Sequence, residues 1–421
     1  MASATASLPH DIIGGILCRL GVKDLLRLRC VSKECCCLID DPGFIKLHLS
    51  HSVKINSNLS LILQIRYGRH FSIRFDSLET FQMLKPEEQL FDISGYQKLN
   101  SPLDESGEEQ GFFVLGSCNG LLGLVNNQEE VSLWNPSTRR SQMLPTARIR
   151  FSPPRLSFRV IFYGFGYDHI SDDYKLVRLV QFNGREGDAF VSEVKVYSLK
   201  TNSWRRIKDF PFYLRVLSGV SGALVNNALH WLASEKPTET RTLLVAFDLG
   251  TEEYRVVELP DCLADWYCGS FHVMDGCLCI IATHLNFQGI DIWMMKEYGV
   301  KESWIKFISI HQKLRSRLAA NVLPLFQFKN RDSVLLNIEG SMFVYDLRSK
   351  WAHKLGNEGG LMPLKTEIMV ESLVPPNGGG ASFNDNNHRG GKKKRKNTKH
   401  QHGGKKTRDD GILSGEVHPV L

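Results

Sequence analysis

Six short motifs, each led by an aromatic residue, recur along the chain and restrict its possible folds more than any other feature. Each motif lies at or near the end of a run rich in alternating apolar and polar residues, the pattern of a half-buried β-strand. They are Phe75-Asp76, Trp134-Asn135, Tyr197-Ser198, Phe247-Asp248, Trp293-Met294 and Tyr345-Asp346. A second aromatic follows four of them after a turn signal: Trp204, Tyr254, Trp304 and Trp351. The chain is therefore built from repeated hairpin units.

The motif spacing is close to the roughly 50-residue period of kelch-type propeller blades. One such sheet cannot bury both faces alone, whereas sheets stacked around an axis cover one another. Because the strands lack the glycine doublets of kelch repeats, we expect a divergent kelch-like β-propeller over residues 111–375. A two-sheet sandwich is the alternative. Residues 51–110 are expected to hold the first strands, over 59–66 and 71–78, and a connecting loop.

Residues 1–50 have the different pattern of several short helices. Ile12, Ile13, Ile16, Leu17 and Leu20 share one broad helical face. Ser32 is a candidate cap for a third helix, and Asp41-Pro42 is a typical start for a fourth. About 40 residues cannot bury a core of useful size, so these helices need something to cover them. The predicted fold class is α+β and multidomain, with this helical module preceding a mainly β domain.

The segment "LPHDIIGGILCRLGVKDLLRLRCVSKECCCLIDDPGFIKLHL" resembles an F-box, the helical module that docks on the Skp-type adaptor of a cullin ubiquitin ligase. The resemblance implies that the adaptor-binding residues are Leu8, Pro9, Ile12, Ile13, Ile16, Leu17, Leu20, Leu25, Leu26 and Val31. Two positions depart from the family pattern. Gly21 replaces a usual Pro, and Cys35 replaces a usual Trp, which raises the question of weaker adaptor binding.

The β region also resembles a known family, the F-box-associated interaction domain of plant F-box proteins. The matching stretches include "GSCNGLLGL", "WNPSTRR", "YGFGYDHISDDYKLVRLV", "NALHWL" and "FDLGTEEYRVVELP". In that family the domain holds the protein to be ubiquitinated. "DIWMMKEYGVKESWIK" and "TRDDGILS" are similar to a member linked to turnover of nucleotide-binding leucine-rich-repeat immune receptors in plant defence. Such receptors are the substrates that this resemblance implies.

The net charge of +7 is concentrated at the C-terminus. Residues 376–421 hold ten Lys or Arg against four Asp or Glu, which leaves the remainder with 42 basic and 41 acidic residues. A near-neutral body argues against specific nucleic-acid binding. The tail is poor in large apolar residues, and we expect it to be disordered. Its basic run Lys392, Lys393, Lys394, Arg395 and Lys396 is a candidate nuclear-import signal. The alternatives are a solvated tail without a role and a segment that makes weak contacts with nucleic acid or anionic lipid. No membrane span or leader is apparent, so we expect a cytoplasmic and nuclear protein.

The residues that could bind a metal or act in catalysis lie in sequence contexts that indicate structural roles. Asp168, His169, Asp172 and Asp173 lie between two strand signals, where turn chemistry explains them. Cys277 and Cys279 alternate along one strand, with His272 and His284 as the candidate bases for a nucleophile. The ten cysteines contain no CxxC pair. We therefore expect no metal, no cofactor and no catalytic residues.

Two functions remain open at this level. The first is a substrate-recognition subunit of a Skp-cullin-F-box ubiquitin ligase, which recruits target proteins for proteasomal degradation. The second is a non-degradative scaffold or ligand-binding propeller with a non-functional F-box. Adaptor binding separates the two.

Overall fold

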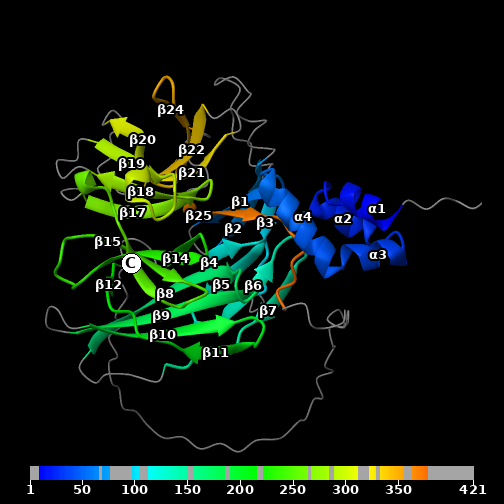
Figure 1. The fold of residues 1–421 in the computed structure, drawn as a ribbon, viewed down its shortest axis with the longest axis horizontal. Coiled ribbons are helices and arrows are strands. Elements are labelled where there is room, and N and C mark those ends of the chain that lie inside the picture. The colour runs from blue at the N-terminus through cyan, green and yellow to red at the C-terminus, as the bar shows by residue number, and fades with distance from the viewer. Residues whose placement is uncertain are drawn as a thin grey trace, which may run out of the picture. The chain divides into compact units, whose positions relative to one another are not determined.

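The computed structural model describes residues 9–65, 69–75, 97–103, 112–149, 156–184, 190–215, 221–263, 267–283, 289–311, 322–328, 332–354 and 363–377. Four helices come first, followed by β-strands (Figure 1). The helices are α1 (His10–Leu17), α2 (Val22–Leu28), α3 (Lys33–Ile39) and α4 (Pro42–Lys54). No helix in these ranges has the length and apolar character needed to cross a membrane.

The helix starts follow local side-chain chemistry. The hydroxyl of Ser32 accepts a hydrogen bond from the Cys35 N–H at 3.1 Å, and the Asp41 carboxylate accepts one from the Phe44 N–H at 2.9 Å. Both caps satisfy N–H groups that the first helical turn leaves free. The expected caps of α3 and α4 are confirmed. Gly21 precedes α2 in an extended conformation, with φ −68° and ψ 153°.

The strands form antiparallel sheets in which sequence neighbours pair. The four-stranded sheets are β4 (Phe112–Cys118) to β7 (Arg140–Met143) with β5 (Leu121–Asn126) and β6 (Val131–Asn135) between them; β17 (Tyr267–Met274), β18 (Cys277–Thr283), β19 (Gly289–Met295) and β20 (Trp304–His311); and β21 (Val322–Gln327), β22 (Ser333–Ile338), β23 (Ser341–Asp346) and β24 (Trp351–Lys354). Each is one propeller blade.

A nine-stranded sheet contains two further blades. One is the meander β8 (Leu156–Asp168), β9 (Asp173–Gly184), β10 (Phe190–Ser198) and β11 (Ser203–Arg206); the other is β13 (Ser221–Val225), β14 (Ala228–Ser234), β15 (Leu243–Asp248) and β16 (Tyr254–Val257), with β12 (Tyr213–Leu214) beside β14. The meanders join through a short parallel pairing of Ser221 with Tyr163 and Gly222 with Gly164. The sheet is therefore two blades that touch along their inner strands.

The remaining sheet closes the ring with strands from both ends of the β region. Its order is β25 (Pro363–Val370), β1 (Leu59–Ile65), β2 (His70–Arg74) and β3 (Gln97–Leu99). The pairing extends from Leu59 with Val370 to Ile65 with Pro363. Consecutive inner strands contact one another in the order β25, β4, β8, β13, β17, β21 and back to β25. The described strands thus form a closed propeller, and the sandwich alternative is wrong.

This closing sheet shifts the start of the β domain relative to the sequence prediction. Residues 51–110 were expected to be separate from a propeller over 111–375, but β1, β2 and β3 belong to the ring. The pairing partner of β1 lies about 300 residues later in the chain. Local patterns do not report such a distant pairing.

The aromatic motifs occupy equivalent positions in the blades. Five lie on third strands, at Trp134, Tyr197, Phe247, Trp293 and Tyr345, and Phe75 directly follows the third strand of the closing sheet. In four of the motifs a polar side chain follows the aromatic and accepts hydrogen bonds from N–H groups of the next turn, at Asn135, Ser198, Asp248 and Asp346. For example, the Asp248 carboxylate accepts hydrogen bonds from the N–H groups of Gly250 and Thr251 at 2.8 and 2.9 Å. The predicted repeat is therefore the structural repeat.

His230, from the "NALHWL" stretch, is buried in a hydrogen-bond network between two blades. Its Nδ1 lies 3.2 Å from the Ala223 carbonyl and its Nε2 lies 2.8 Å from the Tyr298 hydroxyl. A carbonyl only accepts, so we assign the proton to Nδ1, and Nε2 accepts from Tyr298. The Tyr298 oxygen in turn accepts from Arg255 at 2.7 Å. Burial lowers the pKa of His230 to about 4, so the ring is neutral at physiological pH.

We expect this buried imidazole to make the β domain acid-sensitive. The folded-state pKa lies below the unfolded value near 6.5, so the unfolded chain binds more protons between these values and stability falls as pH drops through that window. At the lower end of this pH window the free energy of unfolding is reduced by on the order of 3 kcal/mol. Urea unfolding at pH 6.5 and 4.5 measures it. His230→Phe should be less stable overall but should lose less stability over this interval; equal pH dependence in both proteins would contradict the assignment.

Candidate functional site

The helical module separates the predicted adaptor-binding residues into a buried and an exposed group. Leu17 and Leu25 are buried in a core cluster with Val22, Ile39 and Phe44. Ile13, Leu20 and Leu26 are partly buried against the same cluster. These five predicted residues hold the helices together. A direct contact with a partner through Leu25 is not available while the module keeps this packing.

The exposed group carries the surface available to a partner. Ile12 and Ile16 are 49% and 53% exposed, and Val31 is 72% exposed. Ile12 and Ile16 are four residues apart on α1, so they form one stripe. Pro9, just before α1, is also exposed, whereas Leu8 lies outside the described residues. The assignment of adaptor contacts remains a prediction, and the structure directs it to this stripe.

Cys35, at the position where the F-box family usually has Trp, is only partly buried on α3. The neighbouring Cys36 and Cys37 are partly buried and exposed. The three thiols therefore do not jointly replace an aromatic side chain in the core. The contact area that Cys35 lacks relative to Trp is therefore lost at the surface of the helical module and not in its core.

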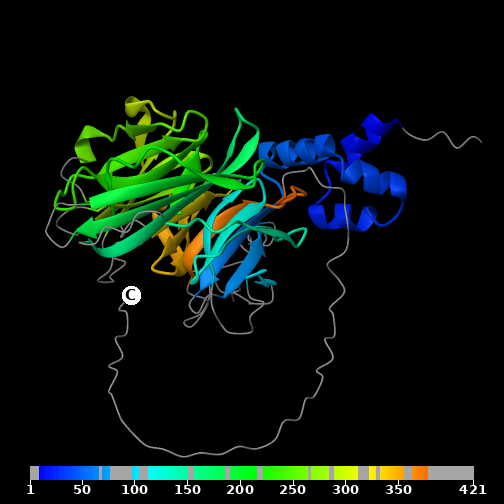
Figure 2. The same cartoon turned by 90° about the horizontal axis from the view of Figure 1, so that it is seen from below.

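Apolar and charged contacts join α4 to the propeller blades. Ile45 and Leu49 of α4 pack against the apolar cluster between the β4–β7 and β8–β11 blades. On the surface, Lys46 forms an ion pair with Asp172 at 3.0 Å. An exposed pair of this kind contributes little, so the apolar packing is the main attachment. Figure 2 shows α4 beside these blades.

The Asp168–Asp173 turn has the structural role expected from its sequence. Asp168 accepts hydrogen bonds from the Ile170 N–H at 2.9 Å and the Ser171 hydroxyl at 2.5 Å, and pairs with Lys175 at 2.9 Å. Burial alone would raise the pKa of Asp168, but these bonds hold it well below its usual range. Across the described ranges no group of three or more His, Cys, Asp or Glu side chains is placed to hold a metal ion.

The proposed Cys–His nucleophile is not supported by the local chemistry. Cys279 is fully buried and Cys277 packs against the same apolar cluster, between β17–β20 and β21–β24. Burial raises the pKa of the Cys279 thiol and lowers that of His272, which lies opposite it on β17. An activated thiol needs a lowered pKa, the reverse of the shift at Cys279. His284 lies outside the described residues.

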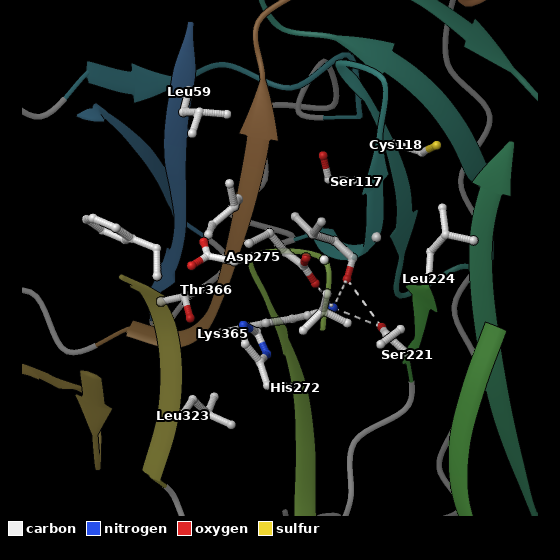
Figure 3. Close-up of a pocket in the computed structure, with 18 of the residues that line it drawn as sticks. Leu59, Ser117, Cys118, Ser221, Leu224, His272, Asp275, Leu323, Lys365 and Thr366 are labelled. Carbon is white, nitrogen blue, oxygen red and sulfur yellow. Dashed lines mark hydrogen bonds and ion pairs between the residues drawn. The ribbon is translucent and has the colours of Figure 1, made fainter. Parts of the chain in front are cut away.

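A cavity of about 1110 Å³ lies among the inner strands. Lys365 of β25 reaches across it, donating to the Val114 carbonyl at 2.7 Å and the Ser221 hydroxyl at 2.9 Å (Figure 3). Its ammonium also pairs with Glu367 at 3.0 Å. These bonds tie the closing strand to two other blades. Sequence reasoning missed this lysine, because nothing near it in the chain indicates what lies across the ring.

Comparisons with known families agree with this architecture. The F-box domain family matches residues 6–47, and the F-box associated beta propeller domain family matches residues 63–368. The second match alone covers more than half of the chain. The chain therefore belongs to the F-box proteins that carry an F-box associated β-propeller.

Individual relatives support the same assignment. The chain is 35% identical to F-box protein CPR1 of Arabidopsis thaliana over 387 residues, which covers 88% of this chain and 89% of the relative. It is 30% identical to F-box protein At4g22390 of the same plant, covering 88% and 90%. The similarity thus extends over both the helical module and the propeller.

Proposed function

We propose that this protein is the substrate-recognition subunit of a Skp-cullin-F-box ubiquitin ligase. The observation that carries the proposal is the Ile12–Ile16 stripe, an exposed apolar surface on the first helix of an F-box. Apolar side chains exposed in this way favour burial by a partner. A Skp-type adaptor, and through it a cullin, is that partner. The chain adds no chemistry of its own; it brings a target close to another protein's active site.

The propeller provides the second binding surface. The ends of β4, β8 and β25 lie on the α4 side of the propeller. Asn119 after β4 contacts Ser372, Asp172 after β8 contacts Lys46 of α4, and Glu371 after β25 contacts Asn58, which follows α4. The opposite face is left for a target. In propellers the loops at such a face determine specificity. Resemblance to the member described above supports nucleotide-binding leucine-rich-repeat immune receptors as targets, and a role in plant defence.

Reconstitution tests the proposal. The full chain, co-expressed with a Skp-type adaptor and a cullin, should purify as one complex of the three proteins. A chain that purifies without the adaptor would favour the alternative, a scaffold or ligand-binding propeller with a non-functional F-box. The substitution at Cys35 is the feature that favours that alternative.

We further propose that the protein occupies both cytoplasm and nucleus, with Lys392–Lys396 as the import signal. Deleting residues 378–421 should reduce nuclear fluorescence of a tagged chain but leave the melting temperature unchanged within about 1 °C, because it leaves every described residue in place. Replacing the five basic residues with Ser in the full chain is the matched control and should give the same redistribution. Equal nuclear fluorescence in all three proteins would rule out the signal.

A further inference from the structure

The segment that follows the closing strand contacts both modules. We call residues 371–374 the strap; in Figures 1 and 2 it is the orange segment that extends beyond β25 toward the helices. It lies outside both family matches, which end at residues 47 and 368. The main chain of the strap begins at Glu371, whose N–H donates to the Asn58 carbonyl at 2.7 Å.

The blade β4–β7 holds one side of the strap. The buried Asn135 amide donates to the carbonyls of Ser372 at 3.0 Å and Val374 at 2.8 Å. The Ser372 hydroxyl donates to the Asn119 carbonyl at 2.7 Å, and Val374 packs in the apolar cluster of this blade and the next. The Asn135 amide thereby uses both of its donors on the strap.

Gly120 shows how closely the strap approaches this blade. A Cβ atom at position 120 would collide with the Ser372 hydroxyl and lie 2.7 Å from the Val370 carbonyl. Gly120 also has a φ of +82°, a conformation that favours glycine. The turn between β4 and β5 is therefore shaped to admit the strap.

The other side of the strap enters the F-box. Leu373 is 7% exposed and belongs to the same core cluster as Leu17, Leu25 and Ile39. A helical module this small has little core of its own, so one buried leucine is a substantial part of it. The side chain arrives from a position more than 300 residues after the last helix.

We infer that Leu373 completes the F-box core, so that the adaptor-binding helices are held in their docking arrangement only when the C-terminal strap is in place. Leu373 and Asn135 are positioning residues for adaptor docking. A chain that ends before the strap, or whose closing strand is displaced, presents a loosened F-box. Binding of this protein to the adaptor of the ligase is thereby coupled to closure of the propeller. This inference rests on the proposed function only for the adaptor step.

The test measures amide hydrogen exchange of the F-box helices in the full chain, and the affinity of the full chain for the adaptor. In Leu373→Ser, amide hydrogen exchange across α1, α2 and α3 should increase at least about tenfold, while β17–β20 should exchange as in the wild type. Adaptor affinity should fall at least about tenfold. Leu373→Met keeps the side-chain volume and should retain both properties. Unchanged exchange in the helices of Leu373→Ser would overturn the inference.

Truncations separate the strap from the tail. A chain ending at Asn377 retains the strap and should bind adaptor as the full chain does, whereas one ending at Val370 should show the same helix exchange as Leu373→Ser. Equal helix protection in both truncations would contradict the coupling. If the wild type itself fails to bind adaptor, the proposed function fails, but the exchange measurements still decide whether the strap stabilises the F-box.

Discussion

The Ile16→Asp variant is expected to lose its complex with a Skp-type adaptor. Ile16 is 53% exposed in the free chain, so the new carboxylate is hydrated there and the fold should be retained. In the complex the same carboxylate would be buried without a partner, which costs several kcal/mol. We expect the dissociation constant to rise at least about 100-fold. Calorimetric titration of purified adaptor into the full chain measures it.

The matched control for this variant is Leu47→Asp. Leu47 is 49% exposed on α4 and is not among the predicted adaptor residues. It should keep wild-type affinity, which separates the α1 stripe from a general effect of added charge. Leu17→Asp is not a suitable test because Leu17 is in the module core. Undiminished affinity in Ile16→Asp would remove the adaptor site from α1.

A full chain carrying Ile12→Asp and Ile16→Asp together should protect its target from degradation. The two substitutions remove attachment to the ligase but leave the propeller intact, so target affinity is unchanged while effective concentration at the ligase vanishes. Overexpressed, the double variant should lengthen the target's half-life severalfold by occupying it. Substitution is preferable to deleting residues 1–50, because Ile45 and Leu49 pack on the propeller and their loss would expose its core.

Local sequence patterns predicted much of the propeller but not its closure. The aromatic motifs mark third strands because the aromatic side chain packs between neighbouring blades, as Trp134 does, and because the polar residue that follows four of them shapes the next turn, as at Asp248. The pairing of β1 with β25 could not be predicted in this way, since both strands look like any other alternating run. Ring closure is a property of the whole chain.

The candidate site shows a similar limit. Helical periodicity identified the apolar positions of α1, but a broad apolar stripe does not show which side faces its own core. Ile16 and Leu17 are adjacent in sequence, yet one is 53% and the other 8% exposed. The role of Leu373 could not be predicted from the sequence because its packing partners lie in the helical module, far away in the chain. Asn135 was identified as part of an aromatic motif, whereas its two bonds to the strap depend on tertiary structure.

The most direct test of the receptor function is the half-life of proteins captured by the chain in plant cells. Proteins that co-purify with the double variant under proteasome inhibition are identified first, with immune receptors of the nucleotide-binding leucine-rich-repeat class as the expected members. Their half-lives are then compared in cells making the wild type, the double variant or neither. The wild type should shorten the half-life of a captured protein, the double variant should lengthen it, and proteasome inhibition should remove the difference. A double variant that speeds the loss of its captured proteins as well as the wild type does would rule out the receptor mechanism.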